Sequence, residues 1–300
     1  MSVVVLFGAG ASYGAGGVLP SAPPLGSSLY RELVSMFPAT WGALPPSLQT
    51  QFYANFEDGM SALWDRGSHA IPVLMQQMAI FFARYQLSSQ RVDGYSKLLD
   101  ALTSSRKPVL FSSLNYDCLF EVAVSMAGRA VNYFDNTPAS DSDIAIWKLH
   151  GSCNFLPHGG VTATRGVSFG PGVTFGTGIR PVNPNEVATY CTSNTALYPA
   201  MAVYARGKPI QIAPEIIQRI QGFWTTAIKS ASTVIIVGAH PHIADRHVWE
   251  PLSATEAKLL FVGNKGAFLD WQSKYRIRGD SIYLGHRFDS SIKAIVKNLW

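Results

Sequence analysis

The chain opens on an uninterrupted run of apolar residues that leads directly into a glycine-rich loop. The residues from Val3 to Phe7 are all apolar, and Gly8, Gly10 and Gly14 follow them. Such a run is typical of a strand that is buried on both faces in a parallel sheet. Glycines directly after the strand allow a tight turn and a close approach between the backbone and a ligand. The opening therefore predicts the first strand and turn of a nucleotide-binding α/β fold.

Four later segments repeat the order of an apolar run followed by glycine or polar residues. They span 108–117, 143–152, 232–240 and 257–266. A shorter apolar run at 281–288 precedes a tail with apolar residues at helical spacing, and the segment 25–37 has the same spacing. Strands that alternate with helices predict a doubly wound, mostly parallel Rossmann-like sheet, in which ligands bind beyond the carboxyl ends of the strands.

Two long segments interrupt this alternation. Residues from about 41 to 107 have mostly helical patterns, whereas residues from about 154 to 215 are rich in glycine, proline, threonine and asparagine without a clear period. We predict a single domain over 1–300, with a helical insertion in the first segment and an irregular insertion or lid in the second. A chain of 300 residues with 47% hydrophobic content is long enough for one large core.

Composition limits the partners and the compartment. The net charge of +5 and the pI of 9.1 come from scattered Lys and Arg without a basic run, so no direct contact with nucleic acid is evident. No apolar stretch reaches the roughly 20 residues of a membrane span, and the N-terminus lacks the basic region of a signal peptide. The cysteines Cys118, Cys153 and Cys191 form no C-x-x-C pair, so neither a disulfide framework nor a cysteine zinc site is indicated. We predict a cytoplasmic protein without membrane contact.

The glycine loop matches neither of two common nucleotide fingerprints. In G-x-G-x-x-G, Gly8 and Gly10 fit but the third position is Tyr13. The acidic partner expected at the next strand end is also missing, since Glu32 lies in a helical pattern, and no Gly-Lys-Ser/Thr completes a Walker A motif. A hydride-transferring dehydrogenase is therefore disfavoured. Two interpretations remain: a cradle whose backbone N–H groups hold a diphosphate, and a purely structural tight turn.

Five motifs, taken in order along the chain, resemble those of one family. They are GAGAS at 8–12, SLNYD at 113–117, KLHGS at 148–152, IIVGAH at 235–240 and FVGN at 261–264. The set resembles the sirtuin family, with its glycine-rich loop, Asn-x-Asp motif, catalytic His-Gly, later strand-Gly segment and following Asn. The P-x-LG-x-x-L stretch at 23–29 is more similar to bacterial sirtuin-like NAD-consuming defence proteins than to histone deacylases. The resemblance extends from the first strand to about Phe288.

The resemblance implies roles in binding and cleaving NAD. The residues implied to cradle the diphosphate are Gly8, Ala9, Gly10 and Ser12. Asn115 and Asp117 would face the ribose next to nicotinamide, and His150 would be the catalytic histidine. These residue types fit the chemistry, because a neutral amide holds water or a ribose hydroxyl and a histidine removes a proton near neutral pH. Asp117 fits equally well as a cap of the helix that starts at Cys118.

Further implied contacts come from the C-terminal half of the chain. Gly238 begins a loop that lines the nucleotide site in relatives, and His240 stands where deacylases carry a serine. Asn264 matches the residue that holds the adenine-side ribose. Gly285, with His286 beside it, would place backbone near the adenine.

Histidines in GAHPHIADRH raise the alternative of a metal site. His240, His242 and His247 are close in sequence, but a proline intervenes and they share no clear helical face, so converging ligands are not expected. Nicotinamide in NAD is positively charged and already a good leaving group, so its release requires neither a metal nor a strong acid. We predict NAD as the substrate without a metal, and Asp245 as a helix cap.

The chain departs from the protein deacylases at two places. Their zinc-binding C-x-x-C pairs are absent, and no Phe-Arg follows Gly14. We therefore predict an NAD glycohydrolase that releases nicotinamide and ADP-ribose, with water as acceptor. The resemblance implies a regulated effector of antiphage defence, controlled by a homo-oligomeric state or a regulatory partner protein. The alternatives are an NAD-dependent protein deacylase or ADP-ribosyltransferase, and a non-catalytic module that senses NAD or ADP-ribose and controls a partner.

Overall fold

A seven-stranded sheet forms the centre of the molecule. The computed structural model describes residues 2–104, 108–136, 142–159, 172–193, 195–242 and 244–299. The strands of the sheet are β1 (Ser2–Phe7), β4 (Val109–Ser113), β5 (Ala130–Asn132), β6 (Asp143–Lys148), β9 (Ala231–Val237), β10 (Lys258–Val262) and β11 (Ser281–Gly285). They lie in the order β11-β10-β9-β1-β4-β6-β5, and every pairing is parallel.

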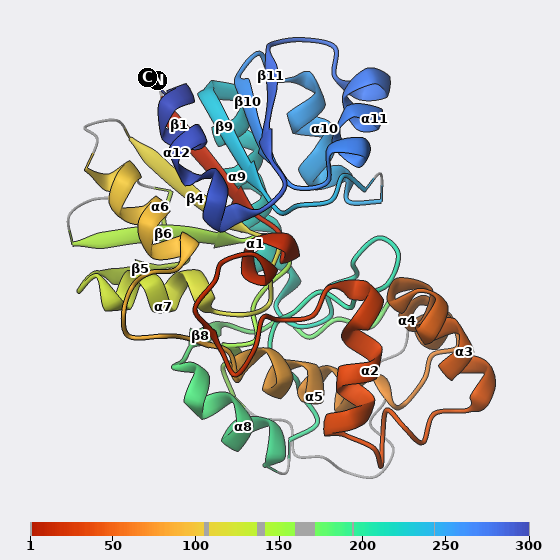
Figure 1. The fold of residues 1–300 in the computed structure, drawn as a ribbon. Helices are drawn as coiled ribbons and strands as arrows, with labels where there is room; N and C mark the ends of the chain where they lie inside the picture. The colour runs from red at the N-terminus through yellow and green to blue at the C-terminus, as the bar shows by residue number, and fades with distance from the viewer. Residues whose placement is uncertain are drawn as a thin grey trace.

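Helices cover both faces of this sheet (Figure 1). On one face, α6 (Gly94–Thr103) packs between α7 (Leu119–Met126) and α12 (Phe288–Leu299). On the other face, α9 (Pro214–Ser230) contacts β1, β6 and β9, and α10 (Arg246–Ala254) packs on α9. Helix α11 (Lys265–Tyr275) contacts β11. Strand β1 is buried from its second residue onward, as a central parallel strand should be, and the predicted α/β Rossmann-like fold is confirmed.

A smaller group of helices lies beyond the carboxyl ends of the strands, below the sheet in Figure 1. This helical lobe comprises α2 (Gly26–Met36), α3 (Pro46–Ala54), α4 (Phe56–Asp65), α5 (Ile71–Ala83) and α8 (Pro184–Thr192). Helices α2, α3 and α4 pack together, and α5 packs on α8. Of the helices in the predicted helical insertion, α6 packs instead on α7 and α12. Helix α8 lies in the segment predicted to be irregular or a lid, of which 160–171 and 194 lie outside the described residues.

The glycine-rich loop after β1 contains short regular elements of its own. Helix α1 (Ala9–Tyr13) begins directly after Gly8. The strand β2 (Val18–Leu19) then pairs antiparallel with β3 (Gln86–Leu87), which ties the loop to the chain between α5 and α6. A second antiparallel pair joins β7 (Phe155–Pro157) to β8 (Ile179–Pro181). The loop is thus held at both ends, with α1 at the junction of the sheet and the helical lobe (Figure 1).

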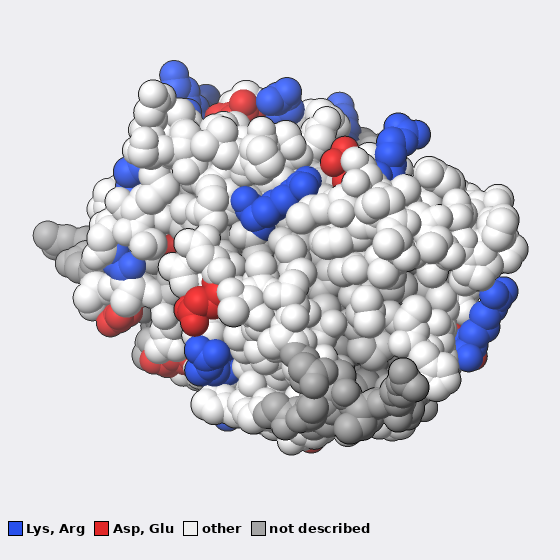
Figure 2. Space-filling view, turned by 90° about the horizontal axis from the view of Figure 1, so that it is seen from below, with Lys and Arg blue, Asp and Glu red and all other residues white. Residues whose placement is uncertain are grey.

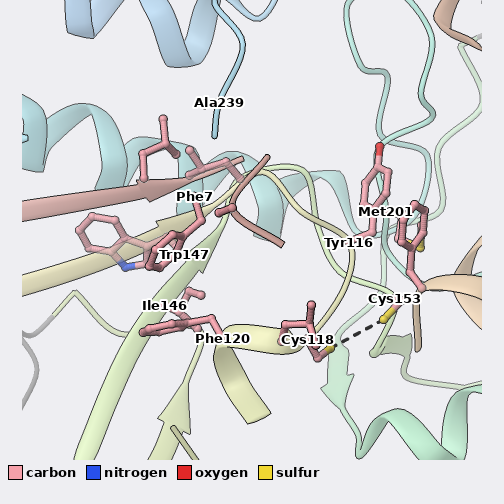
Figure 3. Close-up of a cluster of buried hydrophobic side chains, with 14 of the residues drawn as sticks. Phe7, Tyr116, Cys118, Phe120, Ile146, Trp147, Cys153, Met201 and Ala239 are labelled. Carbon is pink, nitrogen blue, oxygen red and sulfur yellow. Dashed lines mark hydrogen bonds between the residues drawn. The ribbon is translucent and has the colours of Figure 1, made fainter. Parts of the chain in front are cut away.

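An apolar cluster holds the ends of the central strands in place (Figure 3). Phe7 at the end of β1 packs on Phe120 of α7, with the ring centroids 5.0 Å apart. In the same cluster, the sulfur atoms of Cys118 and Cys153 lie 3.7 Å apart, and both residues are free cysteines. These contacts join the turn after β4 to the turn after β6. The SLNYD and KLHGS motifs are therefore positioned by buried apolar packing directly beside them.

The face of the molecule in Figure 2 carries few charged side chains, and they are scattered. On the face shown in Figure 2, Lys and Arg side chains stand apart from one another and form no basic stripe. No helix in the described part of the chain is long and apolar enough to cross a membrane. The face in Figure 2 therefore lacks the clustered positive charge that is typical of a nucleic-acid-binding surface.

Candidate active site

A cavity of about 680 Å³ opens at the carboxyl ends of the central strands. The chain runs from β1 to β4 on one side and later returns to β9 on the other, so this is the switch point at which doubly wound sheets bind ligands. The predicted site residues that line the cavity are Gly8, Ala9, Gly10, Ser12, Asn115, Asp117, His150, Gly238, His240 and Asn264. Gly285 does not line it, although its neighbour His286 does. Residues of α2, α4 and α5 also line the cavity, so the helical lobe completes its wall.

Glycines let the turn after β1 pack directly against the turn after β9. The Gly8 N–H donates to the carbonyl of Val237 at 2.9 Å, and the Gly10 N–H donates to that of Gly238 at 2.9 Å. Gly238 has a φ of +66°, and a Cβ there would meet the backbone of Gly10 and Ala11. The cradle interpretation assigns the N–H groups of Gly8 and Gly10 to a diphosphate. Both groups instead donate to backbone carbonyl oxygens of the protein itself. Close packing of neighbouring strand ends, the tight-turn interpretation, accounts for these glycines.

Asn115 is fixed by a polar network around Ser12. Its Nδ2 donates to the carbonyl oxygen of Gly8 at 3.0 Å and to the Ser12 Oγ at 2.9 Å. The Ser12 Oγ donates to Oδ2 of Asp117 at 2.9 Å and lies 2.8 Å from the Tyr95 hydroxyl. Because both amide hydrogens have acceptors, Oδ1 of Asn115 is the group that can accept a hydrogen bond from a ligand.

Asp117 and Lys148 anchor the turn after β4 to β6. Oδ1 of Asp117 accepts a hydrogen bond from the Leu119 N–H at 3.1 Å, but the N-cap of α7 is Cys118, so Asp117 contacts the first turn from one residue before the cap position. The buried Lys148 ammonium donates to the backbone carbonyl of Asp117 at 2.6 Å and pairs with Glu121 at 3.0 Å. Burial alone would lower the pKa of Lys148, but nearby acidic groups, Glu121 foremost, raise it to about 12. Burial raises the pKa of Asp117, and Lys148 opposes this shift. Lys148, which the sequence analysis missed, thus holds the Asn-x-Asp turn.

His150 is buried, and its ring has two hydrogen-bonding neighbours. Its Nε2 lies 3.1 Å from Nε2 of His247. The ring also forms a hydrogen bond with the backbone of Leu114, and because Nε2 faces His247, this second bond falls to Nδ1. Burial and the nearby Lys208 lower the pKa of His150 to about 3. The imidazole is therefore neutral at neutral pH and has one nitrogen able to accept a proton.

The glycine that follows this histidine has a structural requirement. Gly151 has a φ of +73°, and a Cβ there would meet the carbonyl oxygen of Ala200. The Ala202 N–H donates to the carbonyl of His150 at 2.8 Å. The turn after β6 therefore packs tightly on the 200–202 segment, which accounts for the glycine of the His-Gly pair.

Ionisable residues form another part of the cavity wall, and the sequence analysis missed two of them, Glu57 and Lys208. This charged wall comprises Glu57, Lys208, His242 and Asp245. Nζ of Lys208 lies 2.7 Å from Oε1 of Glu57 and 4.4 Å from the centre of the Tyr204 ring. Nε2 of His242 lies 3.9 Å from Oε2 of Glu57. Glu57 comes from the first turn of α4, so residues far apart in the sequence meet here and no single motif indicates the pair.

Asp245 stands at the start of α10, where a helix cap is predicted. It occupies the N-cap position, and its backbone carbonyl accepts a hydrogen bond from the Val248 N–H at 2.9 Å. Its side chain, however, makes no capping bond. The carboxylate instead lines the cavity, with Oδ1 3.9 Å from Nε2 of His150. The predicted capping role is therefore wrong for the side chain, which is directed to His150.

Residues that follow β10 and β11 line the cavity on its other side. Asn264 caps α11, since its side chain accepts a hydrogen bond from the Ala267 N–H at 3.0 Å. His286 and Arg287 also line the cavity. The Arg287 side chain is 65% exposed and lies 3.4 Å from Asp289. Arg287, another residue that the sequence analysis missed, supplies a guanidinium of the kind that pairs with phosphate groups.

The clustered histidines lie on different surfaces. His240 and His242 line the cavity, whereas His247 contacts His150 and does not line it. Burial lowers the pKa of His240, and His242 adds to this shift. Across the described ranges, no three His, Cys, Asp or Glu side chains converge as metal ligands would.

Comparison with known proteins gives one informative result. No protein-family model matches the chain, and a search of curated proteins finds no match. A solved structure described as "Structural Basis for the Mechanism and Regulation of Sir2 Enzymes" aligns over 100% of this chain and 94% of its own, with 14% identity and a TM-score of 0.51. The fold is sirtuin-like. A structure described as "The Structural basis of Sirtuin Substrate Affinity" aligns over 99% of this chain and 92% of its own, with 13% identity and a TM-score of 0.44.

Proposed function

We propose that this cavity binds NAD and cleaves the bond between its ribose and nicotinamide with water, so that the protein is an NAD glycohydrolase. The observation that carries the proposal is the meeting of Asn115 and His150 in one cavity, beside the glycine turns. These residues come from different strand ends, and together they provide an acceptor for a hydroxyl and a neutral base. The sirtuin-like fold supports the proposal, because the aligned structure is described as one of Sir2 enzymes.

The cavity suits a dinucleotide in size and in the groups along its wall. Ligand cavities of about 300–1,000 Å³ are common in proteins, and this one measures about 680 Å³. Asn264, His286 and Arg287 line the cavity. In this proposal Asn264 and His286 hold the adenosine half, and Arg287 pairs with the diphosphate. Asn115 and His150 would then lie at the ribose next to nicotinamide. The volume and the polar lining of the cavity therefore support a dinucleotide as its ligand.

Two residues have distinct roles in the proposed reaction. Oδ1 of Asn115 accepts a hydrogen bond from a ribose hydroxyl or from the attacking water, and the Ser12 network keeps the amide oriented. His150 accepts the proton that the water loses, because its imidazole is neutral at neutral pH. The nicotinamide leaves with the electrons of the broken bond, which neutralise its ring nitrogen. No acid is needed at the leaving group.

The charged wall favours water over an acylated lysine as the acceptor. Glu57 and Lys208 have side chains that are 15% and 6% exposed, and they form an ion pair beside the cavity. Asp245 adds a further carboxylate near His150. An aliphatic acyl chain packed against these side chains would displace water from their charged groups and offer no hydrogen bond in return. Such desolvation is costly. A water molecule as acceptor leaves these charged groups hydrated.

The cellular role of the proposed activity is NAD depletion under control. Unrestrained hydrolysis of NAD would harm the host cell, so we infer that a homo-oligomeric state or a regulatory partner switches the activity on. The resemblance of the 23–29 stretch to defence proteins supports a role as an antiphage effector in the cytoplasm.

An NAD turnover assay of the purified full chain tests the proposal. Nicotinamide and ADP-ribose are quantified across protein concentrations and with candidate activators, for the wild type and for Asn115→Ala and His150→Ala. We expect each substitution to reduce turnover at least about 100-fold, the range for loss of a group that handles a proton or orients a nucleophile. Full turnover in both variants would contradict the assignment. Binding of NAD by calorimetry without turnover under any condition would indicate the sensing module instead.

A further inference from the structure

One carboxylate oxygen of Asp245, Oδ1, is buried without a hydrogen-bond partner among the described residues. Asp245 is 8% exposed, and its Oδ1 accepts no hydrogen bond. An aspartate at a helix N-cap ordinarily accepts a bond from the first turn, but this one does not. A buried carboxylate oxygen left without a donor is costly. Such a group in a cleft marks a candidate functional position.

The position of Asp245 relative to His150 suggests what this carboxylate does. Its Oδ1 lies 3.9 Å from Nε2 of His150, and both residues line the same cavity. The other nitrogen of His150 is engaged with the backbone of Leu114. Nε2 is therefore the nitrogen at which His150 can take a proton, and the carboxylate lies beside that nitrogen. His247 holds the same Nε2 at 3.1 Å, so ligand binding must displace or share this contact.

The other charged groups around His150 do not stabilise its protonated form. Lys208 acts against protonation of His150, as does burial. Glu57 is paired with Lys208 at 2.7 Å and with His242 at 3.9 Å. Among the described residues, Asp245 is the carboxylate within ion-pair distance of His150. The Asp245 carboxylate would therefore supply the negative charge beside a protonated His150.

We propose that Asp245 is a positioning residue of the NAD cleavage, one that holds the proton on His150 through an ion pair. In this step the bond from ribose to nicotinamide breaks and its electron pair passes to the ring nitrogen. A water oxygen bonds to the ribose carbon and gives one proton to Nε2 of His150. The imidazolium then faces Oδ1 of Asp245, which compensates its charge until the proton passes to solvent. This inference rests on the proposed function.

The test compares Asp245→Asn with a matched control on the same helix. Glu250→Gln makes the same change of charge on α10, but Glu250 is 59% exposed, pairs with Arg246 and does not line the cavity. We expect Asp245→Asn to lower kcat at least about tenfold while KM for NAD changes less than about twofold, because the lost interaction forms only during the reaction. Glu250→Gln should retain wild-type kcat and KM.

Chemical rescue separates an electrostatic role from a purely structural one. In Asp245→Ala, added formate should restore part of kcat, since it can place a carboxylate in the vacated space, whereas His150→Ala should not respond. Melting temperatures establish that the variants are folded, and the isosteric Asp245→Asn carries the test if the alanine variant is not. Wild-type kcat in Asp245→Asn, or an alanine variant that is folded but not rescued, would overturn the role of Asp245 and leave the function intact. A wild-type protein that never cleaves NAD would contradict the function and this role together.

Discussion

The glycine turns and the charged wall line the same cavity, but they are built in different ways. The glycine turns follow β1 and β9 directly, and backbone hydrogen bonds of 2.9 Å from Gly8 and Gly10 lock them together. The charged wall brings together α4, Lys208 and the segment that leads into α10. Glu57 pairs with Lys208 and lies 3.9 Å from His242, whereas Asp245 faces His150. The sheet thus fixes the shape of the cavity, whereas elements outside the sheet supply the charges around His150.

This difference has a consequence for what each region tolerates. At the glycine turns, backbone lies where a side chain would have to go, so a single methyl group disturbs the fold. At the charged wall, side chains meet across a cavity, so an isosteric replacement changes charge without changing shape. We therefore expect substitutions at the first region to act on stability and those at the second to act mainly on chemistry.

The largest stability effect is expected at Gly238. A left-handed residue other than glycine costs about 1–2 kcal/mol, and a Cβ against the backbone of Gly10 and Ala11 adds overpacking of about 1–3 kcal/mol. Gly238→Ala should lower the free energy of unfolding by about 3 kcal/mol in urea titrations. The control is Gly222→Ala in α9, where nothing lies within 4 Å of the added Cβ. Helix propensity predicts that this control is neutral or up to about 1 kcal/mol more stable. Only a small loss of unfolding free energy in Gly238→Ala would contradict the close-packing account.

An intermediate effect is expected from pH, through the histidines beside the charged wall. Burial lowers the pKa of His150 to about 3 and that of His247 to about 4, from an ordinary value of 6.5. Below pH 6.5 the unfolded chain binds protons that the folded protein does not, so this contribution to stability is complete above pH 6.5 and is lost as the pH falls toward 4. Each imidazole contributes about 1.4 kcal/mol per pH unit, or about 2 kcal/mol between pH 6.5 and 5.

Variants isolate this pH effect from other titrations. Burial raises the pKa of Asp117 and of Glu121, which acts in the opposite direction. His150→Asn should therefore have a shallower loss of unfolding free energy than the wild type over the same pH interval, measured by urea titration at each pH. Replacement of the exposed His69 by Asn should leave the slope unchanged. Equal slopes in all three proteins would mean that His150 is not held neutral in the fold.

The smallest stability effect is expected at Asn264, where the two kinds of role can be separated. Its side chain caps α11, so Asn264→Ala should cost about 1 kcal/mol. Asn183 caps α8 in the same way and does not line the cavity, so Asn183→Ala should cost a similar amount. Calorimetry should find weaker NAD binding only in Asn264→Ala. If both variants bind NAD as the wild type does, Asn264 is a cap and no more.

The sequence predicts the fold and the strand ends better than it predicts the chemistry around them. The apolar runs at Val3 to Phe7 and at Val234 to Val237 are buried throughout, as in parallel strands, so the strands and the motifs that follow them can be predicted from local sequence. Lys208 and Glu57 carry no local signal, because their partnership forms only when α4 reaches the 204–208 segment. Asp245 carries a misleading signal, since an aspartate before a helix predicts a cap and here its side chain faces His150.

The most direct test of the central claim is the stoichiometry of NAD cleavage with and without an acylated-lysine peptide. Chromatography of the products would follow nicotinamide and ADP-ribose for the wild type and His150→Ala, under conditions that activate the wild type. A hydrolase with water as acceptor predicts equal amounts of the two products, at a rate that the peptide does not change and that His150→Ala loses. Nicotinamide release that depends on the peptide, or that persists undiminished in His150→Ala, would contradict the account.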